Sequence, residues 1–140
     1  MRRAVFDTNV IVSGFLSPDG PPGRIVEWLR AGRIQAVLDD RIAAEYADVL
    51  ARPKFALPSD EVAFVLAAIV DAAFRVESAP EHQATGLPDA TDAPFLECAR
   101  TAGVPLVTGN PRHYPRSVAR EVSVTTPAQY VASLRHSGRP

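Results

Sequence analysis

Short apolar runs alternate along this chain with longer segments in which apolar residues recur every three or four positions. The runs are typical of buried β-strands, and the periodic segments are typical of helices with one apolar face. Strands are predicted at residues 4–6, 34–38, 104–109 and 121–125. Helices are predicted at residues 21–32, 39–53, 58–74, 89–103 and 126–136. Strands separated by helices indicate an α/β fold with a parallel sheet covered on both faces.

Residue types at the ends of these segments agree with the pattern. Ser59 is expected to cap the helix at 58–74, and Thr126 to cap the last helix with Pro127 at its first position. Gly103 is expected to end the helix at 89–103. Residues 78–88 are polar and are predicted to form a loop.

Size and composition indicate one folded domain, residues 1–140. Apolar residues make up 46% of the 140 residues and charged residues 22%, which is close to the globular average. No run reaches the length of a membrane span, and the N-terminus lacks a signal-peptide core, so we expect a cytoplasmic protein with no membrane contact. The single cysteine, Cys98, excludes an internal disulfide, and the net charge of −1 neither indicates nor excludes nucleic acid.

Acidic residues occur where a parallel sheet binds its ligands. Asp7 directly follows the strand at 4–6, and Asn110 follows the strand and turn at 104–109. Ligands of such sheets lie outside the carboxyl ends of the strands, so both residues belong at one edge. Glu45 and Asp92 lie beside the apolar stripes of their helices, and Asp89 is close enough to Asp92 to join it.

Each acid also has a purely structural interpretation. Asp89 or Asp92 could cap its helix, Asp7 could cap the turn that follows it, and Glu45 could reach solvent from the helix boundary. These interpretations do not explain why several carboxylates converge, since they would repel each other unless a cation lay among them. Oxygen ligands favour Mg²⁺ or Mn²⁺, and an ion held by carboxylates is suited to hydrolysing phosphodiesters.

Four segments together resemble a known family: FDTNVIVSG, EYADVL, DATDAPFLECA and LVTGNPRHYP. In their order and spacing they are similar to the PIN-domain nucleases, particularly the VapC-like toxin branch of toxin–antitoxin systems. The resemblance spans nearly the whole chain. It implies a three-layer α/β/α sandwich with a central parallel sheet, an endoribonuclease that depends on Mg²⁺ or Mn²⁺, a homodimer, and a small antitoxin protein that blocks the site.

The resemblance also assigns roles to individual residues. It implies that Asp7, Glu45 and Asp92 are catalytic metal ligands, and that Asp89 and Asn110 complete the metal site. The residues that would line or support the pocket are Thr8, Asn9 and Thr108. Many PIN nucleases have aspartate where this chain has Asn110, so we expect weaker metal binding and low, selective or absent activity.

Basic residues follow Asn110 closely. Arg112, His113 and Arg116, with Arg120 nearby, could hold the RNA backbone, although they could equally form a solvated surface. Tyr114 could stack on a base, but a packing role is the simpler interpretation.

Other classes of protein fit less well. A phosphoacceptor receiver domain needs a lysine after its last strand, and the chain's one lysine, Lys54, is elsewhere. A haloacid-type phosphatase needs a second acid where Asn9 stands. A catalytically weak or inactive PIN fold that binds RNA or a protein is the main alternative, and Asn110 is its chief support.

Overall fold

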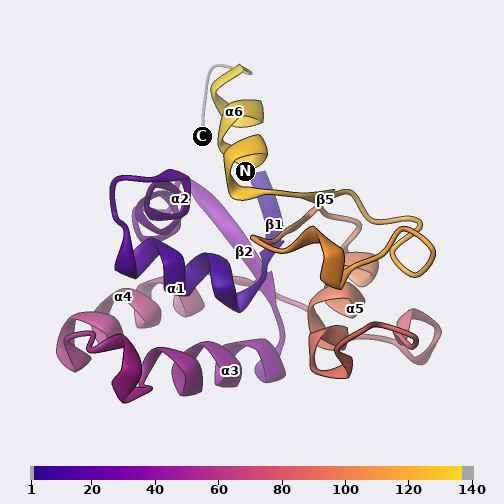
Figure 1. Cartoon of the computed structure of the whole chain (residues 1–140), viewed down its shortest axis with the longest axis horizontal. Coiled ribbons are helices and arrows are strands. Elements are labelled where there is room, and N and C mark those ends of the chain that lie inside the picture. The colour runs from indigo at the N-terminus through magenta and orange to yellow at the C-terminus, as the bar shows by residue number, and fades with distance from the viewer. Residues whose placement is uncertain (1, 137–140) are drawn as a thin grey trace.

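The computed structural model describes residues 2–136 and has the three-layer α/β/α architecture expected from the sequence (Figure 1). The strands in this part of the chain are β1 (Arg2–Phe6), β2 (Ile34–Leu38), β3 (Phe74–Arg75), β4 (Leu106–Val107) and β5 (Val124–Thr125). They form one sheet in the order β3-β2-β1-β4-β5, and every pairing is parallel. The fold-class prediction is therefore confirmed.

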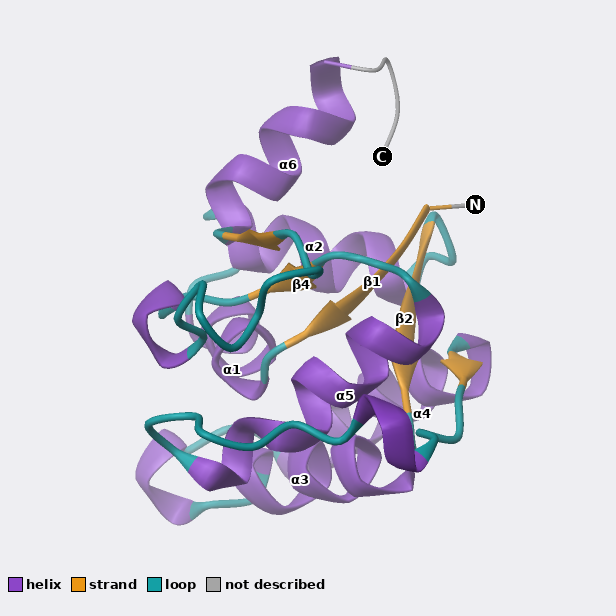
Figure 2. Cartoon of the chain, turned by 90° about the vertical axis from the view of Figure 1, so that its right-hand side faces the viewer, coloured by secondary structure: helices purple, strands orange, loops and turns teal. Residues whose placement is uncertain are grey.

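Helices lie on both sides of this sheet. They are α1 (Thr8–Leu16), α2 (Pro21–Arg30), α3 (Asp40–Leu50), α4 (Ser59–Ala72), α5 (Ala93–Ala102) and α6 (Pro127–His136). Helix α5 packs against β1, β2 and β4, whereas α1 and α2 pack together on the other side (Figures 1 and 2). The core between the layers includes fully buried Phe6, Ile25 and Phe95.

Strand register brings the ends of β1 and β4 together. Phe6 pairs with Val107, and the next residue, Asp7, donates its backbone N–H to the Val107 carbonyl at 2.9 Å. Asp7 and Thr108 are consequently the first residues beyond two adjacent strands. The predicted common edge for Asp7 and the segment around Asn110 is confirmed.

Helix α1 has no counterpart in the sequence prediction, which gives a turn and then apolar residues at 8–16. Three consecutive β-branched residues, Val10, Ile11 and Val12, favour strands intrinsically, and all three are buried, so no one-sided pattern marks a helix. Tertiary packing decides the conformation. A Cβ on Gly14 would lie 2.4 Å from Val26 Cγ2, so glycine allows α1 to approach α2 closely.

Element ends differ from the prediction in smaller ways. Pro58 occupies the N-cap position of α4 and Ser59 is its first residue, so the predicted Ser59 cap is wrong. Helix α4 ends at Ala72, and Phe74, predicted as the last residue of that helix, begins β3 instead. Gly103, with φ +66°, ends α5 as expected, and the Thr126 hydroxyl accepts from Gln129 N at 3.2 Å as an N-cap.

Among residues 2–136, no helix has both the length and the apolar character needed to cross a membrane.

Replacement of Gly14 by alanine tests the close contact between α1 and α2. The added Cβ would also lie 2.7 Å from the Pro22 carbonyl oxygen, so the helices must separate. We expect Gly14→Ala to lower the free energy of unfolding by about 2 kcal/mol, measured by urea denaturation. Gly20→Ala is the control, because its Cβ would meet nothing closer than 3.8 Å. Equal stabilities of the two variants would contradict this packing.

Candidate active site

Asp7 is a buried carboxylate with two hydrogen-bond donors. It stands at the N-cap position of α1, but its side chain makes no capping hydrogen bond. Its Oδ2 accepts instead from Thr108 Oγ1 at 2.9 Å and from Tyr114 Oη at 3.0 Å. Only 5% of the residue is exposed. The charge is therefore held inside the protein by side chains that follow β4, and capping does not explain it.

Asp92 is the second buried carboxylate. It ends the single-turn helix η3 (Ala90–Asp92) and begins α5, again without a capping hydrogen bond from its side chain. No hydrogen bond of good geometry reaches its buried Oδ2, although His113 Nδ1 lies 3.0 Å away. A buried carboxylate oxygen without a hydrogen bond is costly, so this atom is suited to a cation.

Burial and mutual repulsion shift the acidities of these groups. Burial, followed by the charges of Asp7 and Asp89, raises the pKa of Asp92 to about 6. Burial also raises the pKa of Asp7, although the hydrogen bonds from Thr108 and Tyr114 act in the opposite direction. Negative charge is thus disfavoured at both positions, and a bound cation would relieve this cost.

Glu45 approaches the same edge from α3. It is half-buried, and its Oε2 accepts a short hydrogen bond from the Thr8 hydroxyl at the start of α1. The neighbouring Tyr46 is fully buried and donates its hydroxyl to the Phe6 carbonyl. These two contacts attach α3 to the end of β1.

Thr108 organises the turn after β4. Its fully buried hydroxyl donates to Asp7 and accepts from Asn110 N at 3.0 Å and from Asn9 Nδ2 at 3.4 Å. Asn9 Oδ1 in turn accepts from Gly109 N at 2.9 Å. Asn9 and Thr108 therefore lie where a pocket-supporting role was predicted.

Asp89 differs from the other acids. It is exposed, and its Oδ1 accepts from Thr91 N at 2.9 Å and from Thr91 Oγ1 at 2.7 Å, so it caps η3. Helix capping, which was considered for Asp89 and Asp92 from the sequence, therefore applies to Asp89. Its charge nevertheless acts on Asp92.

Residues 110–120, which follow the end of β4, carry several basic side chains. Asn110 is half-buried and precedes the short helix η4 (Pro111–His113). Arg112, Arg116 and Arg120 are exposed, and none of them forms an ion pair within residues 2–136. These exposed guanidinium groups are thus not neutralised by an acid in this part of the chain.

The sequence did not reveal the contact between Tyr114 and Asp7. The packing role expected for Tyr114 is correct in that only 3% of the residue is exposed, but its hydroxyl also bonds a carboxylate 107 positions away. Neither periodicity nor spacing could show this, because the contact depends on how η4 folds back after β4.

The donor chemistry at Asp7 and Asp92 fits a hard divalent cation. Within the described residues, no group of three or more His, Cys, Asp or Glu side chains is placed to hold a metal ion. Mg²⁺ does not require such a group, because it keeps several waters and commonly binds through one or two carboxylates plus substrate phosphate. The chemistry of this donor set, two buried carboxylates whose mutual repulsion a cation would offset, is the observation that supports the fit.

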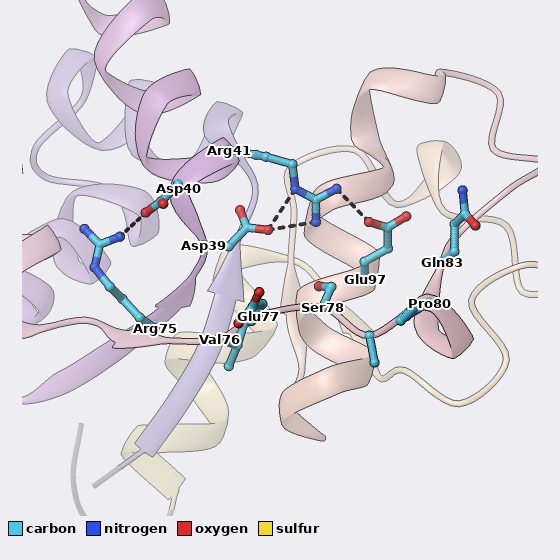
Figure 3. Close-up of a pocket in the computed structure, with 11 residues that line it drawn as sticks. Asp39, Asp40, Arg41, Arg75, Val76, Glu77, Ser78, Pro80, Gln83 and Glu97 are labelled. Carbon is cyan, nitrogen blue, oxygen red and sulfur yellow. Dashed lines mark hydrogen bonds and ion pairs between the residues drawn. The ribbon is translucent and has the colours of Figure 1, made fainter.

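A large cavity of about 880 Å³ lies elsewhere on the same edge, beyond β2 and β3 (Figure 3). Several of its charged side chains pair with one another: Arg41 contacts Asp39 at 2.7 Å and Glu97 at 2.8 Å. Glu97 also accepts from Ala84 N at 2.8 Å. These bonds join α3, α5 and the loop before η3, and none of the predicted site residues lines this cavity.

Comparison with known families agrees with the architecture. A model of the PIN domain matches residues 3–112, and the chain therefore belongs to the PIN domain family. PIN domains are commonly nucleases that use divalent metal ions. No significant match to a curated protein or to a solved structure is found.

Substitution of Asp92 tests the free-energy cost of its buried negative charge when no metal is bound. Because the folded pKa of about 6 exceeds the ordinary 3.8, the folded state loses stability as pH rises from about 4 to about 6, and the loss is complete above that range. At pH 8 in EDTA, we expect the free energy of unfolding of Asp92→Asn to exceed that of wild type by about 1 kcal/mol, allowing for solvent screening.

The control for this substitution is Asp89→Asn. The hydrogen bonds from Thr91 lower the pKa of Asp89 and oppose its repulsion of Asp92, so this variant should gain less stability at pH 8 than Asp92→Asn does. Urea denaturation between pH 4 and pH 8 measures both. A destabilised Asp92→Asn at pH 8 would refute the account of its burial.

Proposed function

We propose that this protein is a metal-dependent endoribonuclease that hydrolyses RNA phosphodiester bonds, and that it is the toxin of a toxin–antitoxin pair. The observation that carries the proposal is the pair of buried carboxylates, Asp7 and Asp92, at the carboxyl edge of the sheet of a PIN domain. Mg²⁺ or Mn²⁺ is the proposed cofactor, with Asp7 and Asp92 as its principal ligands. Glu45, Asp89 and Asn110 complete its surroundings.

The chain's own residues have distinct tasks in this reaction. Asp7 and Asp92 would hold the divalent ion, which would supply positive charge for the transition state and lower the pKa of water so that hydroxide forms near neutral pH. Asp7 is fixed by Thr108 and Tyr114, so its geometry is set before substrate arrives. Glu45 has one oxygen bound by Thr8, and its Oε1 can accept the proton of the attacking water.

Substrate binding is assigned to Arg112, His113 and Arg116. The exposed arginines lack ion-pair partners in the described part of the chain, which supports contact with the phosphate backbone. His113 contacts Asp92 directly, with its Nδ1 3.0 Å from Asp92 Oδ2. An RNA strand held by the arginines would place a phosphate near the acids.

The partners and the location follow from the resemblance to VapC-like toxins. A small antitoxin protein would cover the site, and the protein would act in the cytoplasm as a homodimer.

The alternative function is a weak or inactive PIN module that binds RNA or a protein. Asn110 favours it, because the amide removes one negative charge from the site. An amide oxygen can still bind a hard ion directly or through water, so the substitution alone does not decide between the two functions.

Cleavage of RNA in the presence of Mn²⁺ or Mg²⁺ tests the proposal. We expect wild type to cut and Asp7→Ala to lose at least about 100-fold in rate, because a principal metal ligand is removed. Asp48→Ala is the matched control, since Asp48 is an exposed acid on α3. EDTA should abolish cleavage. Asn110→Asp should cut faster than wild type at low metal concentration.

Two results would contradict the catalytic assignment. One is equal cleavage by wild type and Asp7→Ala, and the other is cleavage that persists in EDTA. RNA binding without cleavage by wild type, at any metal concentration, would establish the alternative function.

Neutralising the basic residues tests the substrate contact. The double variant Arg112→Gln, Arg116→Gln should bind RNA about tenfold more weakly at low salt, and the slope of log affinity against log salt should fall by about one to two. Arg24→Gln, Arg33→Gln is the control, because it removes the same charge from exposed positions in and after α2. Fluorescence anisotropy with inactive protein measures both, and indistinguishable affinities of the two double variants would disprove the contact.

A further inference from the structure

The three tyrosines of the chain are all buried, but their hydroxyls have different environments. Tyr46 donates to the backbone carbonyl of Phe6. The Tyr130 hydroxyl has no hydrogen-bond partner within residues 2–136. Tyr114 alone donates to a carboxylate, at Asp7 Oδ2. A hydroxyl that donates to a buried charge contributes more to stability than a hydroxyl without a partner. Comparing the three tyrosines therefore distinguishes the effect of a buried ring from the effect of its hydroxyl.

Tyr114 and Thr108 both donate to the same oxygen of Asp7, at 3.0 Å and 2.9 Å. Two donors on Oδ2 restrict the rotation of the carboxylate and set the direction in which its oxygens point. We propose that Tyr114 is a positioning residue for the metal site: its hydroxyl fixes the orientation in which Asp7 binds the divalent ion. This inference rests on the proposed function, because it assumes that Asp7 is a metal ligand.

The local backbone explains how one short segment supplies both donors. Asn110 N is bound to Thr108 Oγ1, and Tyr114 N donates to the Pro111 carbonyl at 3.0 Å, closing the turn of η4. This turn brings the residue after η4 back to the strand end where Thr108 already holds Asp7. Tyr114 then fills a buried position with its ring while its hydroxyl reaches the carboxylate.

The residue before Tyr114 reaches the other buried acid. His113 Nδ1 lies 3.0 Å from Asp92 Oδ2. Two consecutive side chains therefore contact the two carboxylates proposed as metal ligands, one each. The single loop that carries His113 and Tyr114 therefore links the position of Asp7 to that of Asp92. A residue that served only to fill space would not need to contact a carboxylate.

The chemistry of the phenol suits the role. Burial and the charges of Asp7 and Asp92 raise the pKa of Tyr114 far above its ordinary value, so its hydroxyl stays protonated and donates at every pH at which the protein works. Groups that hold a metal ligand by hydrogen bonding commonly change metal affinity by about 10- to 100-fold when they are removed.

Binding of Mn²⁺ to the purified full chain tests the inference, with free Mn²⁺ measured by electron paramagnetic resonance. Tyr114→Phe removes only the hydroxyl and keeps the ring that fills the site. We expect it to bind Mn²⁺ about 10- to 100-fold more weakly than wild type. Raising the Mn²⁺ concentration should restore RNA cleavage, because the ligand itself remains.

The other two tyrosines supply matched controls. Tyr130→Phe should leave Mn²⁺ affinity unchanged and should not lower the Tm in EDTA, since its hydroxyl has no partner among the described residues. Tyr46→Phe should lower the Tm in EDTA because a buried bond is lost, but it should leave Mn²⁺ affinity within about twofold of wild type. Equal weakening of Mn²⁺ binding by Tyr46→Phe and Tyr114→Phe would show general loosening and overturn the inference.

Failure of the inference and failure of the proposed function give different results. If Asp7→Ala and wild type bind Mn²⁺ equally, Asp7 is not a metal ligand, and both the proposed function and the inference about Tyr114 are wrong. If binding depends on Asp7 but Tyr114→Phe matches wild type, the metal site stands and the positioning role of Tyr114 is disproved.

Discussion

The burial of a carboxylate at the end of the central strand is the constraint on which the rest of this structure depends. Asp7 immediately follows β1, and parallel pairing with β4 puts Thr108 beside it. Because the residue is almost fully buried, its charge has to be met by donors or by a cation. The Thr108 and Tyr114 hydroxyls meet one oxygen, and the turn that carries them is held by Asn9.

A second buried carboxylate, Asp92, raises the cost of keeping Asp7 charged. Asp92 lies close enough for Asp7 to raise its pKa, and its buried Oδ2 has no hydrogen bond. Asp89, three residues earlier, shows what an ordinary acid does at a helix start: it is exposed and caps the turn. The contrast between these two aspartates separates an acid that caps a helix from a buried acid that does not. The chain belongs to the PIN domain family, whose members generally use divalent metal ions.

Much of this arrangement could be predicted from the sequence, because it depends on local patterns. Alternating strands and helices fixed the fold class, and the rule for strand ends brought Asp7 and the segment of Asn110 to one edge. Helical spacing correctly predicted that Asp92 faces the core. Helix α1 was missed, since its β-branched residues are buried without periodicity and packing on α2 decides their conformation. The bond from Tyr114 to Asp7 was missed because it joins residues 107 positions apart through a loop.

The account stands or falls on whether a divalent ion binds between Asp7 and Asp92. The most direct measurement is a crystal structure of the protein grown with Mn²⁺, with the ion located by its anomalous scattering. The account predicts one strong anomalous peak within coordination distance of both carboxylates. A peak only in the cavity beyond β2 and β3, or none at a Mn²⁺ concentration that saturates binding in solution, would contradict it.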